Sequence, residues 1–179
     1  MSELKLRLAG SESSRGEATW SIESPTPGVV LIDVNVVGAN RRPPLHWRTG
    51  TWQKPPLDIS LDREGRLIGF QFVLQDERVK EGVATDLPAP KACWPIFDVA
   101  NWPKDRYLDD KSPVKTIRLQ RGELVLRIAD DSDLLRQACQ VASGLILAFD
   151  QDGRLGEIRL GPLSVEDWEA IDAFSGAGG

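Results

Sequence analysis

Two copies of one pattern decide the fold: LDISLDREGRL at positions 57–67 and LILAFDQDGRL at positions 145–155, 88 positions later. In each copy an alternating apolar run leads into Asp-x-acid-Gly-Arg-Leu, and a second strand-like run follows. Alternation with a period of two is typical of a β-strand with one buried face. The chain is therefore predicted to contain the same β-hairpin twice.

The residues between the paired runs are those that a short hairpin turn requires. An aspartate side chain accepts hydrogen bonds from backbone N–H groups two residues on, so we expect Asp62 and Asp150 to cap the turns. Glycine adopts a positive φ without strain, so we expect Gly65 and Gly153 to close them after a type I turn.

The hairpins divide the chain into two related halves within a single domain, 1–179. The halves cover about 17–75 and 114–162, and a proline-rich, charged, irregular loop over 76–113 joins them. The predicted fold is mainly β with a minor α+β character, built of antiparallel sheets from these two hairpin-containing halves. Within the second half, 133–142 fits a strand or a helix, since its apolar residues also have helical spacing.

A short helix over about 164–174 is predicted to end the chain. Ser164 is placed as its N-cap, and Asp167 stands three residues later, as in a capping box. Trp168, Ile171 and Phe174 would form the stripe that faces the core.

Composition narrows the classes of function. The chain has 179 residues and a formal net charge of −5, which argues against a protein that binds duplex nucleic acid and permits a basic partner. No run approaches the roughly 18 apolar residues of a membrane span, and the start of the sequence lacks the apolar segment of a signal peptide. We therefore expect a cytoplasmic protein without a membrane partner, in which Cys93 and Cys139 are buried, reduced thiols.

Residues for catalysis or metal binding are scarce. His46 is the one histidine, and a lone histidine beside an aromatic residue is more often a packing or hydrogen-bonding residue than a catalytic one. Two cysteines and one histidine cannot form a standard zinc site. The acidic residues around Gly153 resemble the opening of a calcium loop, but the glycine comes too early and the twelfth position is Gly161. We expect a non-enzyme that binds no metal or cofactor.

Two sets of residues are candidates for partner binding. Tryptophan is favoured at interface hot spots, and four tryptophans lie in proline-rich, loop-like settings: Trp47, Trp52, Trp94 and Trp102. Acidic side chains steer a basic partner, and two groups of them occur in the middle loop and at a turn: Asp105, Asp109, Asp110, Asp130, Asp131 and Asp133. The plainer interpretation is that the rings cover the core and the acids are only solvated.

The order of several short motifs resembles that of a group of small, uncharacterised bacterial proteins. HWRTG at 46–50, LDISL at 57–61 and GRL at 65–67 resemble their segment W-[KR]-[ST]-G … L-x-I-x-[IL] … G-x-[IL]. PIFD at 95–98 with Trp102 is similar to their P-x-F-D … W, and LSVED at 163–167 to their L-[ST]-x-x-[EQ] ending. Such proteins resemble the immunity proteins of polymorphic toxin systems, which neutralise a cognate toxin from a neighbouring gene. The resemblance implies no catalytic residues.

Two functions from different classes follow. The first is a non-catalytic immunity-type protein that binds and neutralises a cognate toxin domain. The alternative is a module that binds or senses a small ligand in a pocket lined by Trp47, Trp94 and Trp102. A weaker third option is an enzyme that uses His46 with an aspartate or glutamate.

Overall fold

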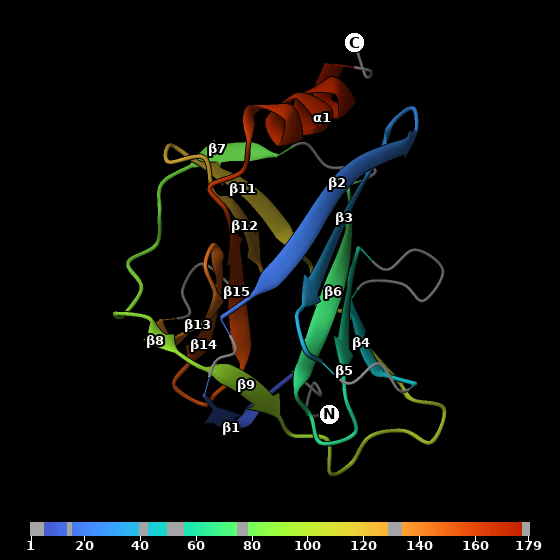
Figure 1. Cartoon of the computed structure of the whole chain (residues 1–179), viewed down its shortest axis with the longest axis vertical. Coiled ribbons are helices and arrows are strands. Elements are labelled where there is room, and N and C mark those ends of the chain that lie inside the picture. The colour runs from blue at the N-terminus through green and yellow to red at the C-terminus, as the bar shows by residue number, and fades with distance from the viewer. Residues whose placement is uncertain are drawn as a thin grey trace.

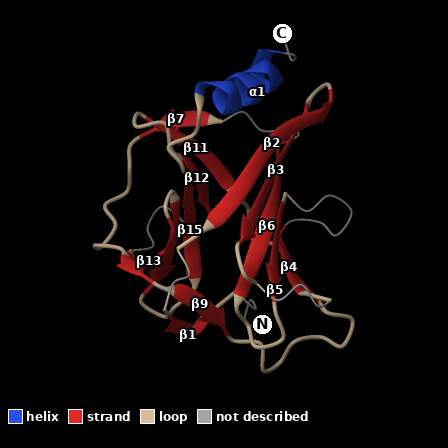
Figure 2. Cartoon of the chain, viewed as in Figure 1, coloured by secondary structure: helices blue, strands red, loops and turns tan. Residues whose placement is uncertain are grey.

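The structure is a computed structural model that describes residues 6–13, 16–39, 43–49, 56–74, 79–128 and 134–176. Figure 2 shows that nearly all of its regular structure is β-strand, with one short helix at the end of the chain. The mainly β fold with two related hairpin-containing halves is therefore confirmed.

Two large sheets make up most of the molecule (Figure 1). The first sheet has the order β10-β4-β5-β6-β3-β2 and the second has the order β7-β11-β12-β15-β14-β13-β8. The strands of the first sheet are β2 (Ala18–Thr26), β3 (Val29–Val36), β4 (Leu45–Thr49), β5 (Leu57–Leu61), β6 (Leu67–Leu74) and β10 (Tyr107–Asp110). Those of the second are β7 (Lys80–Gly82), β8 (Lys91–Ala92), β11 (Lys115–Leu119), β12 (Leu124–Arg127), β13 (Leu135–Ala142), β14 (Leu145–Asp150) and β15 (Leu155–Leu160).

The two sheets repeat one topology. In the first sheet the hairpin β2–β3 adjoins the meander β4–β5–β6 through the antiparallel pair β3–β6. In the second sheet the hairpin β11–β12 adjoins the meander β13–β14–β15 through the pair β12–β15. Each meander also gains a parallel edge strand from the middle of the chain, β10 on β4 and β8 on β13. The duplication seen in the hairpins thus extends over five strands of each sheet.

The hairpin turns have the predicted chemistry. Asp62 Oδ1 accepts hydrogen bonds from the backbone N–H groups of Glu64 and Arg66, both at 2.9 Å. Asp150 Oδ1 accepts the equivalent bonds from Asp152 at 2.8 Å and Arg154 at 2.9 Å. The glycines that follow have positive φ, 89° at Gly65 and 74° at Gly153.

A small third sheet, β1 (Leu8–Glu12) paired with β9 (Trp94–Phe97), closes one end of the molecule. Its strand β9 caps the hairpin of the first half, and β1 caps the hairpin of the second. The N–H of Phe97 donates to the Gly65 carbonyl oxygen at 2.8 Å, and the N–H of Leu8 donates to the Gly153 carbonyl oxygen at 2.8 Å. The small sheet therefore links the hairpins of the two halves.

The two turn glycines differ in how closely the capping strand approaches them. A Cβ on Gly65 would come 2.1 Å from the Phe97 carbonyl oxygen, whereas the nearest atom to a Cβ on Gly153 is 3.5 Å away. We expect Gly153→Ala to lower the free energy of unfolding by about 1 kcal/mol through its positive φ. Gly65→Ala should cost about 2 kcal/mol more, because it also forces β9 away. Urea unfolding of both variants measures the difference, and equal losses would contradict the cap.

The helix α1 (Val165–Gly176) lies across the end opposite to the small sheet (Figure 1). Its capping box forms as predicted: the N–H of Asp167 donates to Ser164 Oγ at 3.1 Å, and the N–H of Ser164 donates to Asp167 Oδ2 at 3.2 Å. Trp168 and Ile171 are buried and join the core between the sheets.

The structure corrects two expectations from the sequence and decides one alternative that the sequence left open. The segment 76–113 is less irregular than predicted, because β7, β8, β9 and β10 extend all three sheets. The segment 133–142 is a strand where it is described, β13, since its backbone pairs with both β14 and β8. Cys93 and Cys139 are not reduced thiols: they form a disulfide, which the pairing of β8 with β13 brings about by placing their Cα atoms 5.5 Å apart.

Candidate functional site

The outer face of the first sheet carries a set of polar side chains on several neighbouring strands. Cross-strand pairing aligns them in two rows that run across the strands. One row contains Asn35, Gly69, Ser60, His46 and Tyr107. The other contains Asp33, Gln71, Asp58, Arg48 and Asp109.

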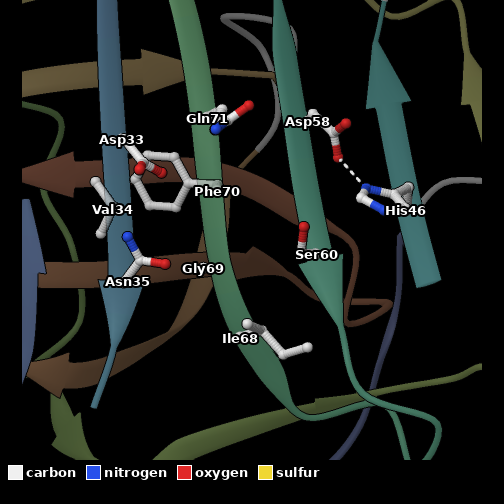
Figure 3. A pocket seen from close by; sticks show the side chains of 10 residues that line it. All are labelled: Asp33, Val34, Asn35, His46, Asp58, Ser60, Ile68, Gly69, Phe70 and Gln71. Carbon is white, nitrogen blue, oxygen red and sulfur yellow. Dashed lines mark hydrogen bonds and ion pairs between the residues drawn. The ribbon is translucent and has the colours of Figure 1, made fainter. Parts of the chain in front are cut away.

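A groove of about 210 Å³ lies between these rows (Figure 3). Its floor passes over Gly69, which has no side chain and whose Cβ would come 2.1 Å from the Val34 carbonyl oxygen. The irregular register between β5 and β6 at Ser60 also turns Ile68 to the groove. Six polar side chains from four strands line it: Asp33, Asn35, His46, Asp58, Ser60 and Gln71.

His46 and Asp58 form a hydrogen-bonded pair at one wall of the groove. His46 Nδ1 lies 2.8 Å from Asp58 Oδ1, as the dashed line in Figure 3 shows. The imidazole also stacks on the ring of Tyr107, with 4.9 Å between centroids and 16° between planes. Both contacts fix the orientation of the ring. Among the described residues no serine or cysteine side chain is hydrogen-bonded to His46, so the nucleophile–base pair that covalent catalysis uses is not assembled there.

Arg48 is occupied by a partner outside the groove. Its Nε and Nη2 donate to Asp109 Oδ1 at 2.8 Å and to Oδ2 at 3.1 Å, and its guanidinium lies 4.3 Å from the centroid of Tyr107. The hydrogen bond with Asp109 raises the pKa of Arg48 above its usual value, against the opposing effect of partial burial. The charges of Arg48 and Asp109 therefore offset each other, and Asp33 and Asp58 leave the groove itself negative.

The tryptophans singled out from the sequence occupy other places. The prediction that Trp47 and Trp94 lie in loops is wrong: they are on β4 and β9 and are 1 % and 3 % exposed. Trp94 Nε1 donates to the Leu67 carbonyl oxygen at 2.8 Å, which holds the small sheet against β6. Trp102 is half-buried and donates from Nε1 to the Arg106 carbonyl oxygen at 3.0 Å. Trp52 lies outside the described residues.

The aspartates predicted to bind a partner also differ in their exposure. Asp109 and Asp105 are exposed, and Asp105 Oδ1 accepts from the N–H of Tyr107 at 3.3 Å. Asp110 is only 6 % exposed, because the alternation along β10 turns it inward, and its Oδ1 accepts from the N–H and the Oγ of Ser112. It therefore does not meet a partner. Asp130, Asp131 and Asp133 lie outside the described residues.

Sequence reasoning missed most of the groove. Asp33 and Asn35 interrupt the apolar run at alternate positions, a signal that one face of β3 is exposed. The structure bears this signal out, because the residues of β3 alternate between buried and half-buried. Ser60 and Gln71 gave no separate signal, because only the pairing of β5 and β6 brings them together.

Further searches add no feature to the site. No group of three or more metal-ligating side chains occurs among the residues that the structure describes. Within the same ranges, the helix is too short and too polar to traverse a bilayer. A scan against models of protein families finds no match to this chain, and a search of curated proteins also finds none.

Proposed function

We propose that this chain is a non-catalytic, immunity-type protein that binds and neutralises a cognate toxin domain through the outer face of the first sheet. The observation that carries the proposal is the open polar groove over Gly69. Its polar side chains contribute nothing to the core between the sheets, which lies on the other face of the same strands. The rim residues Tyr107 and Asp109 extend the same surface to the edge strand.

The arrangement suits recognition better than chemistry. The side chain of His46 is 21 % exposed and that of Asp58 is 25 % exposed, and both are held in place by neighbouring residues. Fixed polar groups bind a partner without losing much conformational entropy. The negative charge of the groove and the net charge of −5 would also steer a basic partner to this face.

The alternative pocket lined by tryptophans receives no support. Trp47 and Trp94 are buried in the core, and the groove has no tryptophan among its lining residues. A small ligand in this groove would instead have to be polar, because most of the groove's side chains are polar.

Co-expression tests the proposal directly. We expect cells that produce the toxin domain encoded beside this gene to survive when the chain is present, and to die when it carries Asp33→Asn, Asp58→Asn and Tyr107→Ala together. The matched control is Asp152→Asn, which removes an exposed carboxylate from the distant β14–β15 turn and should protect fully. Equal killing with and without the wild-type chain, or a neighbouring gene that encodes no toxin, would refute the proposed function.

The cytoplasmic location remains a prediction. The disulfide between Cys93 and Cys139 argues against it, because structural disulfides are rare where glutathione and thioredoxin keep thiols reduced. The redox state of these two residues in the cell would therefore indicate the compartment in which the protein meets its toxin.

A further inference from the structure

The duplication provides an internal comparison for the groove. Gly69 pairs with Asn35 and Ser60 in the first sheet, and Glu157 pairs with Arg127 and Ala148 in the second. Gly69 and Glu157 therefore occupy equivalent positions on the outer faces of the two sheets, and Gln71 and Arg159 are equivalent by the same register.

On the second sheet this outer face is occupied by the chain itself. The segment between β7 and β8, 83–90, runs from one edge strand of the sheet to the other. Arg127 Nη2 donates to Thr85 Oγ1, and Arg159 Nη2 donates to the Thr85 carbonyl oxygen at 2.6 Å. Glu157, which is 0 % exposed, accepts from both arginines beneath this segment. The second sheet thus docks an extended segment by offering cations to its oxygen atoms.

On the first sheet the equivalent face has the opposite chemistry. Asn35 and Gln71 stand where the second sheet has Arg127 and Arg159, and Asp33 and Asp58 flank them. Gly69 places no side chain at the position where the second sheet has Glu157, and it lines the groove. No segment of the described chain lies in the groove, and Gln71 at its centre is exposed.

We propose that the groove over Gly69 receives an extended segment of the partner protein and binds a lysine or arginine side chain of that segment. This inference deepens the proposed function, on which it rests, by naming the chemistry of the contact. The first sheet would dock its partner as the second sheet docks residues 83–90, with the charges reversed: acceptors on the sheet and a cation on the segment.

The groups in the groove match a cationic side chain. The Asp33 carboxylate has no hydrogen bond or ion pair within the described residues, and Asp58 uses only Oδ1 for His46. A guanidinium offers five N–H donors in a planar fork, which suits two carboxylates supported by amide and hydroxyl oxygens. The volume of about 210 Å³ is below the roughly 300–1,000 Å³ of pockets for drug-sized molecules. It therefore suits one side-chain head group.

The experiment uses two small probes that differ in charge. Isotope-labelled protein is titrated with N-acetyl-arginine methylamide and, separately, with the citrulline analogue, which has a similar shape and no charge. We expect the arginine probe to shift the NMR signals of the Gly69 amide and of the Asn35 and Gln71 side-chain amides at millimolar concentrations. The citrulline probe should leave them unchanged, and spermidine tests whether a free polyamine binds equally well.

Variants separate this inference from the proposed function. Asp33→Asn with Asp58→Asn should weaken binding of the arginine probe about 10-fold or more, since charge-assisted hydrogen bonds become neutral ones, while Asp152→Asn should not change it. Absence of shifts at the groove, equal binding of citrulline, or tighter binding of spermidine than of the arginine probe would overturn the inference, even if the toxin is neutralised. Probe binding without protection from the toxin would instead refute the function and leave the cation site standing.

Discussion

Replacing Glu157 with glutamine is expected to lower the free energy of unfolding by about 3–5 kcal/mol, the usual cost of removing one partner from a buried ion pair. Glu157 is 0 % exposed. Its Oε2 accepts from Arg127 Nη2 at 3.0 Å, and its Oε1 accepts from Arg159 Nε at 2.5 Å. These arginine side chains are only 16 % and 12 % exposed, so water has little access to replace the lost carboxylate.

The loss should extend to the segment that covers the cluster. Arg127 and Arg159 hold Thr85 while Glu157 holds the arginines, so the glutamine leaves two positive charges packed together beneath residues 83–90. We therefore expect hydrogen exchange at 83–90 to accelerate in the variant, in addition to the lower urea midpoint. Local opening of this kind exposes the backbone before the sheet itself unfolds.

Two controls distinguish burial from charge alone. Asp172→Asn breaks the exposed pair between Asp172 and Arg118, whose side chains are 59 % and 33 % exposed, and should cost less than about 1 kcal/mol. Replacing the whole cluster, with Glu157→Leu, Arg127→Met and Arg159→Met together, should restore most of the stability, because apolar residues can replace a whole buried ionic cluster. A loss for Glu157→Gln as small as that for Asp172→Asn would show that the cluster is solvated.

The parts of the fold that could be predicted are those determined by neighbouring residues. The Asp62 and Gly65 turn needs only a side-chain acceptor and a positive φ within four residues, and its copy at Asp150 and Gly153 makes the pattern unmistakable. The capping box of Ser164 is local in the same sense. Turns and caps of this kind can be predicted from the sequence without knowledge of the tertiary structure.

The groove could not be predicted because it depends on register between distant strands. Asp33, Asp58 and Gln71 are on three strands, and only the pairing of β3, β5 and β6 places them side by side. The prediction that Trp47 and Trp94 lie in loops was wrong for a related reason. Proline-rich surroundings indicated loops, but Trp47 lies on a strand whose alternating residues face the core. Burial of a residue is set by what packs over it, and its immediate neighbours do not contain that information.

Removing the disulfide, with Cys93→Ser and Cys139→Ser together, is expected to lower the free energy of unfolding by about 4 kcal/mol on the chain-entropy model. The bond joins residues separated by 46 positions, so it restricts the unfolded chain over a long loop. It also ties the end of the segment from β7 to β8 to the strand β13, where the N–H of Cys93 donates to the Gln140 carbonyl oxygen at 3.1 Å.

Urea unfolding with and without a reducing agent checks this second prediction. The wild-type protein should lose stability on reduction, whereas the double serine variant should not respond. Alkylation of the unreduced, denatured protein should label neither cysteine, since the structure leaves no free thiol in the described chain. Two labelled thiols in protein taken directly from cells would instead restore the prediction of reduced cysteines and a cytoplasmic location. An intact bond would favour an encounter with the toxin in an oxidising compartment, because cytosolic thiol systems would otherwise remove the link between the end of β8 and β13.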